Sequence, residues 1–201
     1  MLGAVALGIM GSAAQAADLI LPPAILDPIY ESPMFDFEGL YIGVQGGAFF
    51  PLANGQTTAE FGSGTINHTA GLIGLVAGVN FMATDMFLVG VEIQGNVLFG
   101  GITPAVSGGY AAEGLILGKL GVVLTDNVLI YAAGGFGVMG GPDFGPTSGT
   151  YYAVGGGLEF GVTDSLGIRG EVLYKHLINN PAAAPSDAGM SATIGLLYHL
   201  N

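Results

Sequence analysis

From Gly39 onward, apolar residues alternate with small or polar residues at a period of two. In the clearest segment, from Phe87 to Val97, the odd-numbered positions are apolar apart from Gly95, whereas the even-numbered positions from Gly90 to Asn96 are Gly, Glu, Gln and Asn. Successive side chains of a β-strand point to opposite faces, so this alternation predicts strands that each have one apolar face. The segments 152–162 and 168–175 follow the same rule.

Segments of this kind recur along the rest of the chain. They lie at 39–50, 69–82, 86–98, 110–124, 128–140, 150–162, 166–176 and 189–201. Eight is an even number of strands, as expected for an antiparallel sheet that closes on itself with both chain ends on one side.

The connections between these segments alternate in length. Three are short and share a Thr-Asp pair, at 83–85, 124–127 and 162–165, and the carboxylates of Asp85, Asp126 and Asp164 can hydrogen-bond to the turn backbone. The other four are long, at 51–68, 99–109, 141–149 and 177–188. Short turns on one side and long loops on the other are typical of bacterial outer-membrane barrels, whose short turns are periplasmic.

The charge count indicates which face of the sheet points outward. Only 9% of the residues are charged, and the chain has only three Lys and Arg. If the polar faces met water, the outer wall would carry few charges among many glycines, which is too bare a surface for a soluble protein. The charged residues on the strands are Glu92, Glu113, Lys119, Glu159, Arg169, Glu171 and Lys175.

With the faces reversed, the apolar side meets lipid and these charges pair inside the lumen. Closure is then required, because an open sheet edge in hydrocarbon leaves backbone groups unpaired. The sequence therefore predicts an all-β fold, a closed antiparallel eight-stranded transmembrane β-barrel. A helical membrane protein is the rival, but the apolar runs at 69–82 and 115–124 are shorter than the roughly 17 residues that a spanning helix needs.

Two stretches precede the alternating region. Residues 1–16 are mostly apolar and end in Ala14-Gln15-Ala16, the small-x-small pattern of a signal peptidase site, which predicts a signal peptide. Residues 17–38 are rich in proline and acids, so we expect an extended periplasmic segment through which a periplasmic or envelope protein could bind. The barrel is assigned to 39–201.

The composition also excludes several kinds of partner and cofactor. A net charge of −12 provides no cationic surface for a phosphate backbone, so nucleic acid is not expected as a partner. The chain has no cysteine and therefore no thiolate metal site. The Thr-Asp turns lack the dense ligand pattern of calcium loops, and no metal or other cofactor is predicted.

Three functions are compatible with the charged set on the strands. In the first, the charges pair and fill the lumen, because an eight-stranded barrel is just wide enough to be filled by its own side chains. In the second, the lumenal glycines leave a narrow porin-like channel for small solutes. The third is a lipid-modifying enzyme that uses a histidine as base, and we assign no catalytic residues to it. The candidates are His68, His176 and His199, with Ser186 and Asp187 near His176 in sequence.

The chain has the motif Phe-Asp-Phe-Glu-Gly-Leu-Tyr-Ile-Gly at 35–43, and further short motifs lie at 89–92, 118–121, 129–135, 154–159 and 169–174. Together these motifs resemble the porin-family small outer-membrane barrels, the OmpA-like surface antigens typical of alphaproteobacteria. The resemblance implies a non-catalytic barrel in the outer membrane of a Gram-negative bacterium, with a structural and surface role. It also implies outer-membrane lipid and the barrel-assembly machinery as partners. The chain departs from the family in having Phe37 in place of a Trp and Leu200-Asn201 in place of a terminal aromatic residue.

Overall fold

The computed structural model describes residues 35–52, 59–61, 64–66, 68–103, 109–141, 149–178 and 188–200. The expected signal peptide at 1–16 lies outside these ranges. Of the acidic segment 17–38, the structure describes only 35–38.

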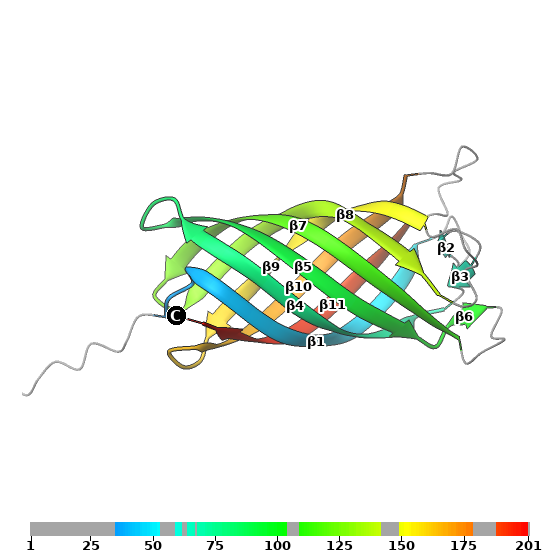
Figure 1. Cartoon of the computed structure of the whole chain (residues 1–201), viewed down its shortest axis with the longest axis horizontal. Coiled ribbons are helices and arrows are strands. Elements are labelled where there is room, and N and C mark those ends of the chain that lie inside the picture. The colour runs from blue at the N-terminus through cyan, green and yellow to red at the C-terminus, as the bar shows by residue number, and fades with distance from the viewer. Residues whose placement is uncertain are drawn as a thin grey trace, which may run out of the picture. The chain divides into compact units, whose positions relative to one another are not determined.

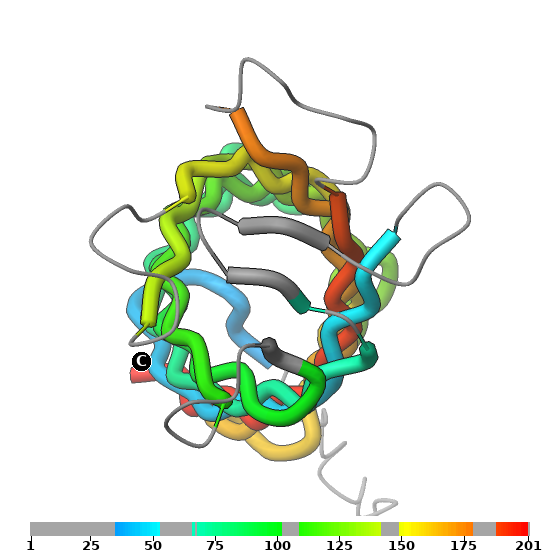
Figure 2. Tube along the Cα trace, turned by 90° about the vertical axis from the view of Figure 1, so that its right-hand side faces the viewer, coloured from blue at the N-terminus to red at the C-terminus, as the bar shows by residue number. Residues whose placement is uncertain are grey.

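Eight long strands form a closed antiparallel barrel, as the alternation predicts (Figures 1 and 2). Their order around the barrel is β1-β11-β10-β9-β8-β7-β5-β4, so the first long strand pairs with both the second and the last. The observed bounds lie within two residues of the predicted ones. They are β1 (Gly39–Leu52), β4 (Ala70–Met82), β5 (Phe87–Phe99), β7 (Tyr110–Thr125), β8 (Val128–Gly140), β9 (Gly149–Gly161), β10 (Leu166–Leu177) and β11 (Ala188–His199).

The two ends of the barrel differ. One, here called the turn end, carries the three short turns and the start of β1. The other, the loop end, carries the long connections and a three-stranded sheet that the sequence did not predict, made of β2 (Ala59–Phe61), β3 (Gly64–Ile66) and β6 (Ile102–Thr103) (Figure 1). Ile66 is fully buried in the same apolar cluster as Phe49 and Leu98, so this sheet is anchored in the barrel interior.

Threonine supplies the side-chain hydrogen bonds in two of the short turns. Thr84 Oγ1 accepts from the backbone N–H of Met86 and Phe87 at 3.3 and 3.1 Å, and Thr163 Oγ1 accepts from Leu166 at 3.1 Å. Asp85, Asp126 and Asp164 lie in the turns with exposed side chains. In these two turns the Thr of the Thr-Asp pair, and not the Asp, is therefore the residue seen to hydrogen-bond to the turn backbone.

The apolar face of the sheet is the outer one. Leu75, Leu120 and Ile194 are 67%, 67% and 70% exposed, whereas Lys119, Arg169 and Lys175 are each 1% exposed. These three are all the Lys and Arg that the chain has. The outer wall is therefore an aliphatic and aromatic surface without Lys or Arg. No helix in the described ranges is long and apolar enough to cross a membrane.

Several inward-facing glycines lie directly beneath aromatic rings. A Cβ added at Gly78 would lie 2.3 Å from the Tyr41 hydroxyl oxygen, and one at Gly161 would lie 2.3 Å from the Phe35 ring. Real Cβ atoms do not approach so closely, so only glycine leaves room for these rings. The other pairs of this kind are Gly137 with Tyr151, Gly157 with Tyr131, and Gly189 with Phe49. At these positions the space left by glycine is filled by a ring.

We predict that Gly78→Ala destabilises the barrel by about 1–3 kcal/mol, because the added methyl group displaces the Tyr41 ring in a packed lumen. The temperature at which the folded, fast-migrating gel band is lost should fall. Gly95→Ala is the matched control, since Gly95 faces outward on β5 with nothing within 4 Å of its added Cβ. Equal effects of the two substitutions would contradict this packing role.

Candidate functional site: the polar lumen

The lumen contains all seven charged residues that the sequence assigned to it. Glu92 and Glu159 are 0% exposed, and Glu113, Lys119, Arg169, Glu171 and Lys175 are between 1% and 4% exposed. They reach the interior because each occupies an inward position of a strand. Charges buried in this way require partners, and the structure supplies them in three groups along the barrel.

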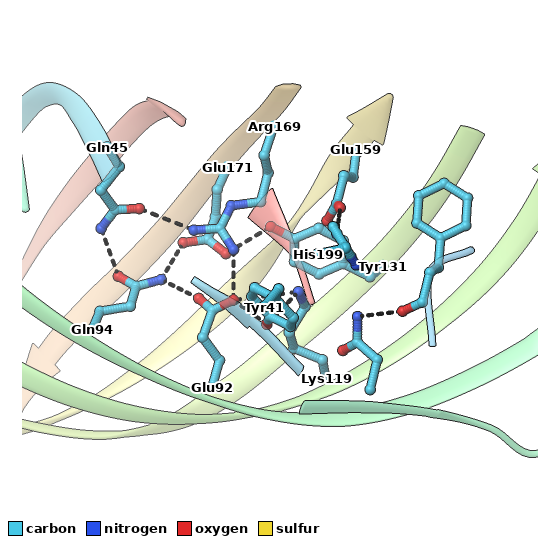
Figure 3. A network of polar contacts seen from close by, with 12 residues as sticks. Tyr41, Gln45, Glu92, Gln94, Lys119, Tyr131, Glu159, Arg169, Glu171 and His199 are labelled. Atoms are coloured by element: carbon cyan, nitrogen blue, oxygen red, sulfur yellow. Dashed lines mark hydrogen bonds and ion pairs between the residues drawn. The ribbon is translucent and has the colours of Figure 1, made fainter. Parts of the chain in front are cut away.

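The central group surrounds Glu92 on β5 (Figure 3). Its Oε2 accepts from Arg169 Nη1 at 2.5 Å, from the Tyr41 hydroxyl at 2.5 Å and from Lys119 Nζ at 3.3 Å. Its Oε1 accepts from Gln94 Nε2 at 2.7 Å. One carboxylate therefore joins side chains from β1, β7 and β10 to its own strand across the lumen.

Glutamines extend this group to a second acid, Glu171 on β10. Gln94 donates to Glu171 Oε1 and the Tyr131 hydroxyl donates to Glu171 Oε2, both at 2.7 Å. Gln45 accepts from Arg169 Nη2 at 3.0 Å and donates to Gln94 Oε1 at 3.1 Å (Figure 3). Each of these two amide groups both donates and accepts hydrogen bonds, so the network connects side chains from opposite sides of the lumen.

A second group surrounds Glu113 on β7, toward the loop end. Lys175 Nζ donates to Glu113 Oε1 at 2.6 Å, and the ammonium group lies 5.7 Å from the centroid of the Tyr151 ring. Tyr151 also donates its hydroxyl to Glu113 Oε2 at 2.9 Å. Asn96 donates to Glu113 Oε1 at 2.8 Å and accepts from Gln45 at 2.8 Å, which connects this group to the central one.

The third group lies at the turn end. His199 Nε2 is 2.7 Å from Glu159 Oε1, and both side chains are fully buried. The imidazole stacks on the Tyr41 ring at a centroid distance of 5.4 Å, with the rings of Phe35 and Phe37 at 4.8 and 6.4 Å. Residues 35–37, expected to belong to an extended periplasmic segment, are therefore packed at the barrel mouth.

Sequence reasoning missed the neutral half of this network. Gln45, Gln94, Asn96, Tyr41, Tyr131 and Tyr151 all donate hydrogen bonds to the charged groups or to one another. The period-two alternation places each of them at an inward-facing position of its strand. Their place in the alternation could therefore have identified them as lumenal residues. Their pairings depend on the stagger between strands, which alternation does not reveal.

The other candidate residues lie apart from this network. His176 faces outward on β10, where it stacks on Tyr152 at a centroid distance of 5.5 Å and its Nδ1 is 2.8 Å from the Leu177 carbonyl oxygen. Ser186 and Asp187 lie outside the described residues, and His68 is exposed. Within the described ranges, no three His, Asp or Glu side chains are grouped so that they could hold a metal ion.

The fold matches solved outer-membrane proteins, whereas no protein-family model and no curated protein matches the sequence. The crystal structure of Ail, the attachment invasion locus protein of Yersinia pestis, aligns with a TM-score of 0.52 at 14% identity, over 81% of this chain and 98% of Ail.

Two further structures align with lower scores. Ail from Yersinia pestis in a phospholipid bilayer nanodisc gives a TM-score of 0.47 at 15% identity, covering 81% of this chain and 100% of Ail. The outer membrane protein OprG from Pseudomonas aeruginosa gives 0.38 at 12% identity, covering 83% and 99%. The likeness to the Ail crystal structure shows that this chain shares the barrel fold of Ail.

We predict that Arg169→Met destabilises the barrel by about 3–5 kcal/mol, because it removes the closest cation from a buried carboxylate. Adding Glu92→Gln should recover part of the loss, since the amide needs no counter-charge. Unfolding by urea in detergent micelles measures both effects. Asp164→Asn, in an exposed turn, is the control and should change stability by less than about 0.5 kcal/mol. A double variant no more stable than Arg169→Met would contradict charge pairing as the cause.

Proposed function

We propose that the chain is an integral outer-membrane β-barrel protein with a structural, surface-exposed role, whose lumen is closed by its own side chains. The observation that carries this proposal is the hydrogen-bonded network that joins β1, β5, β7 and β10 through Glu92. The polar groups of this lumen hydrogen-bond to one another inside the barrel. The outer wall can therefore be apolar and face lipid. The aliphatic outer wall and the fold shared with Ail support this location.

The proposed orientation places the turn end in the periplasm and the loop end outside the cell. It rests on the contrast between three tight turns and four longer connections, which is the usual arrangement in bacterial outer-membrane barrels. On this proposal the stretch 17–38 of the sequence is periplasmic. This acidic, proline-rich segment remains our candidate contact for a periplasmic or envelope protein.

The more specific assignments rest on the sequence motifs. The resemblance of 35–43 and the later motifs to the porin-family surface antigens of alphaproteobacteria supports a surface protein of that kind, inserted by the barrel-assembly machinery. A signal peptide at 1–16 is the corresponding export signal. A non-catalytic role agrees with the lumen, where Glu92, Glu113 and Glu171 are already engaged by lysine, arginine, tyrosine or amide donors.

A narrow channel for small solutes is the main alternative, and conductance separates it from a closed barrel. We predict that the folded chain in a planar lipid bilayer gives no steady single-channel current, because side chains from opposite walls meet across the lumen. The variant Glu92→Ala/Arg169→Ala, which removes both central side chains, should raise the conductance. Steady current through the unmodified chain would favour the channel function instead.

A lipid-modifying activity is the second alternative. Its test is made at His176, one of the three candidate bases: lipid turnover that is present in the unmodified chain and lost in His176→Ala would establish it. We expect no turnover in either protein, since the imidazole lies between aromatic rings on the outer face of β10.

A further inference from the structure

A pocket of about 1000 Å³ opens at the turn end of the barrel. Three pieces of the chain line it: residues 35–37, residues 82–86 at the turn between β4 and β5, and residues 123–126 at the turn between β7 and β8. A pocket of this size has room for several side chains of a bound polypeptide. It is here called the turn-end pocket.

Direct contacts fix the walls of the turn-end pocket to one another. The backbone N–H of Phe35 donates to the Asp126 carbonyl at 3.2 Å, which joins the first piece to the β7–β8 turn. The backbone N–H of Val123 donates to the Met86 carbonyl at 2.8 Å, which joins the two turns. Phe35 and Phe37 are 4% and 3% exposed, and their rings meet edge to face at 4.7 Å. The pocket is therefore preformed, and a partner need not order its walls on binding.

The lining of the turn-end pocket is largely apolar. Met82 and Val123 are partly buried and pack against the apolar cluster of the barrel interior. Met86 and Leu124 are each 55% exposed. Methionine is flexible and polarisable, and it is enriched, together with aromatic residues, where proteins bind polypeptides. The lining therefore suits apolar side chains of a partner.

The turn-end pocket also has an acidic rim. The side chains of Asp36, Asp85 and Asp126 belong to the lining and are exposed. Glu38 and Asp164 add two further exposed carboxylates at the same end of the barrel. All three Lys and Arg of the chain are buried in the lumen, so the surface of the turn end has none. This end therefore presents a negative potential that attracts cationic groups.

The charge of the rim distinguishes between the possible occupants. Residues 17–34 of the chain itself contain three acids, Asp18, Asp27 and Glu31, and no Lys or Arg, so like charges disfavour them. A phospholipid headgroup would bring an anionic phosphate to the same carboxylates. A polypeptide segment with Lys or Arg next to apolar residues complements both the rim and the lining.

We propose that the turn-end pocket binds a basic segment of a periplasmic or envelope protein, with apolar side chains in the pocket and Lys or Arg at the rim. The periplasmic location of this partner rests on the orientation given under the proposed function, whereas the pocket and its charge do not. The proposal adds a structured contact site to the candidate stretch 17–34.

Fluorescence anisotropy with the folded full chain in non-ionic detergent micelles tests the pocket. The probe is a dye-labelled, end-capped peptide in which Lys alternates with Leu, and the matched peptide has Glu in place of Lys. We expect saturable binding of the Lys peptide that weakens with added NaCl, because salt screens the rim charges, and no binding of the Glu peptide. Binding of the Lys peptide no stronger than to empty micelles, or equal binding of both peptides, would overturn the proposal.

Substitutions separate the pocket from a general attraction to an acidic protein. Asp85→Asn/Asp126→Asn should weaken binding of the Lys peptide by about fivefold or more, since two exposed charge pairs are lost. Glu38→Gln/Asp164→Asn removes as many carboxylates from the same end but outside the pocket lining, and should change the affinity by less than about twofold. Equal losses in the two double variants would assign binding to overall charge and overturn the proposal.

A third variant tests the space inside the pocket. Ala83 is exposed in the lining, so Ala83→Trp places an indole where the apolar side chains of the peptide would lie. Most of the binding should be lost, while heat-dependent migration on a detergent gel shows that the barrel is folded. Binding as tight as that of the unmodified chain would place the peptide elsewhere and contradict the proposal.

A separate measurement tests the orientation, so that the pocket and the proposed function can fail independently. Because the chain has no cysteine, Asp164→Cys introduces a single thiol at the turn end. A polymer-linked maleimide too large to cross the outer membrane should label this thiol only after the membrane is permeabilised. Labelling of intact cells would contradict the periplasmic orientation and exclude a periplasmic partner. Failure of peptide binding would reject the pocket and leave the orientation unaffected.

Discussion

The pairing of buried charges inside the barrel is the interaction on which the rest of the structure depends. All three Lys and Arg of the chain lie in the lumen, and each reaches a glutamate from another strand. An inward carboxylate without a cationic or hydrogen-bonding partner would oppose folding, whereas a partnered one links strands distant in sequence. Because the charged groups of the strands are paired in the lumen, the outer face of the barrel can be apolar, as an integral membrane barrel requires.

Inward-facing glycines make room for the tyrosine rings of the same polar network. The rings of Tyr41, Tyr131 and Tyr151 place their hydroxyls on Glu92, Glu171 and Glu113, and each ring lies over a glycine on another strand. A larger residue at Gly78 would push the Tyr41 ring away from the carboxylate it serves. Part of the high glycine content is thus explained by the polar network itself.

The sequence predicted the fold more completely than it predicted the site. Period-two alternation located all eight barrel strands, because lipid outside and a small lumen inside impose opposite chemistry on alternate residues. It could not assign Arg169 to Glu92, since that contact joins β10 to β5 across the lumen and depends on the stagger of the closed sheet. The packing of Phe35 and Phe37 was missed for a related reason, because neighbouring prolines and acids suggested only an extended segment.

The central claim is that the apolar face of the sheet points outward, toward lipid. Because the chain has no tryptophan, a single introduced tryptophan can test this claim by fluorescence. Phe136→Trp places an indole on the outer wall, where Phe136 is 64% exposed, and Phe49→Trp places one in the lumen, where Phe49 is fully buried. In vesicles of brominated phospholipid, the fluorescence of the first should be strongly quenched and that of the second should be nearly unchanged. Quenching of the second alone, or of neither, would contradict a lipid-facing apolar wall and favour a soluble barrel.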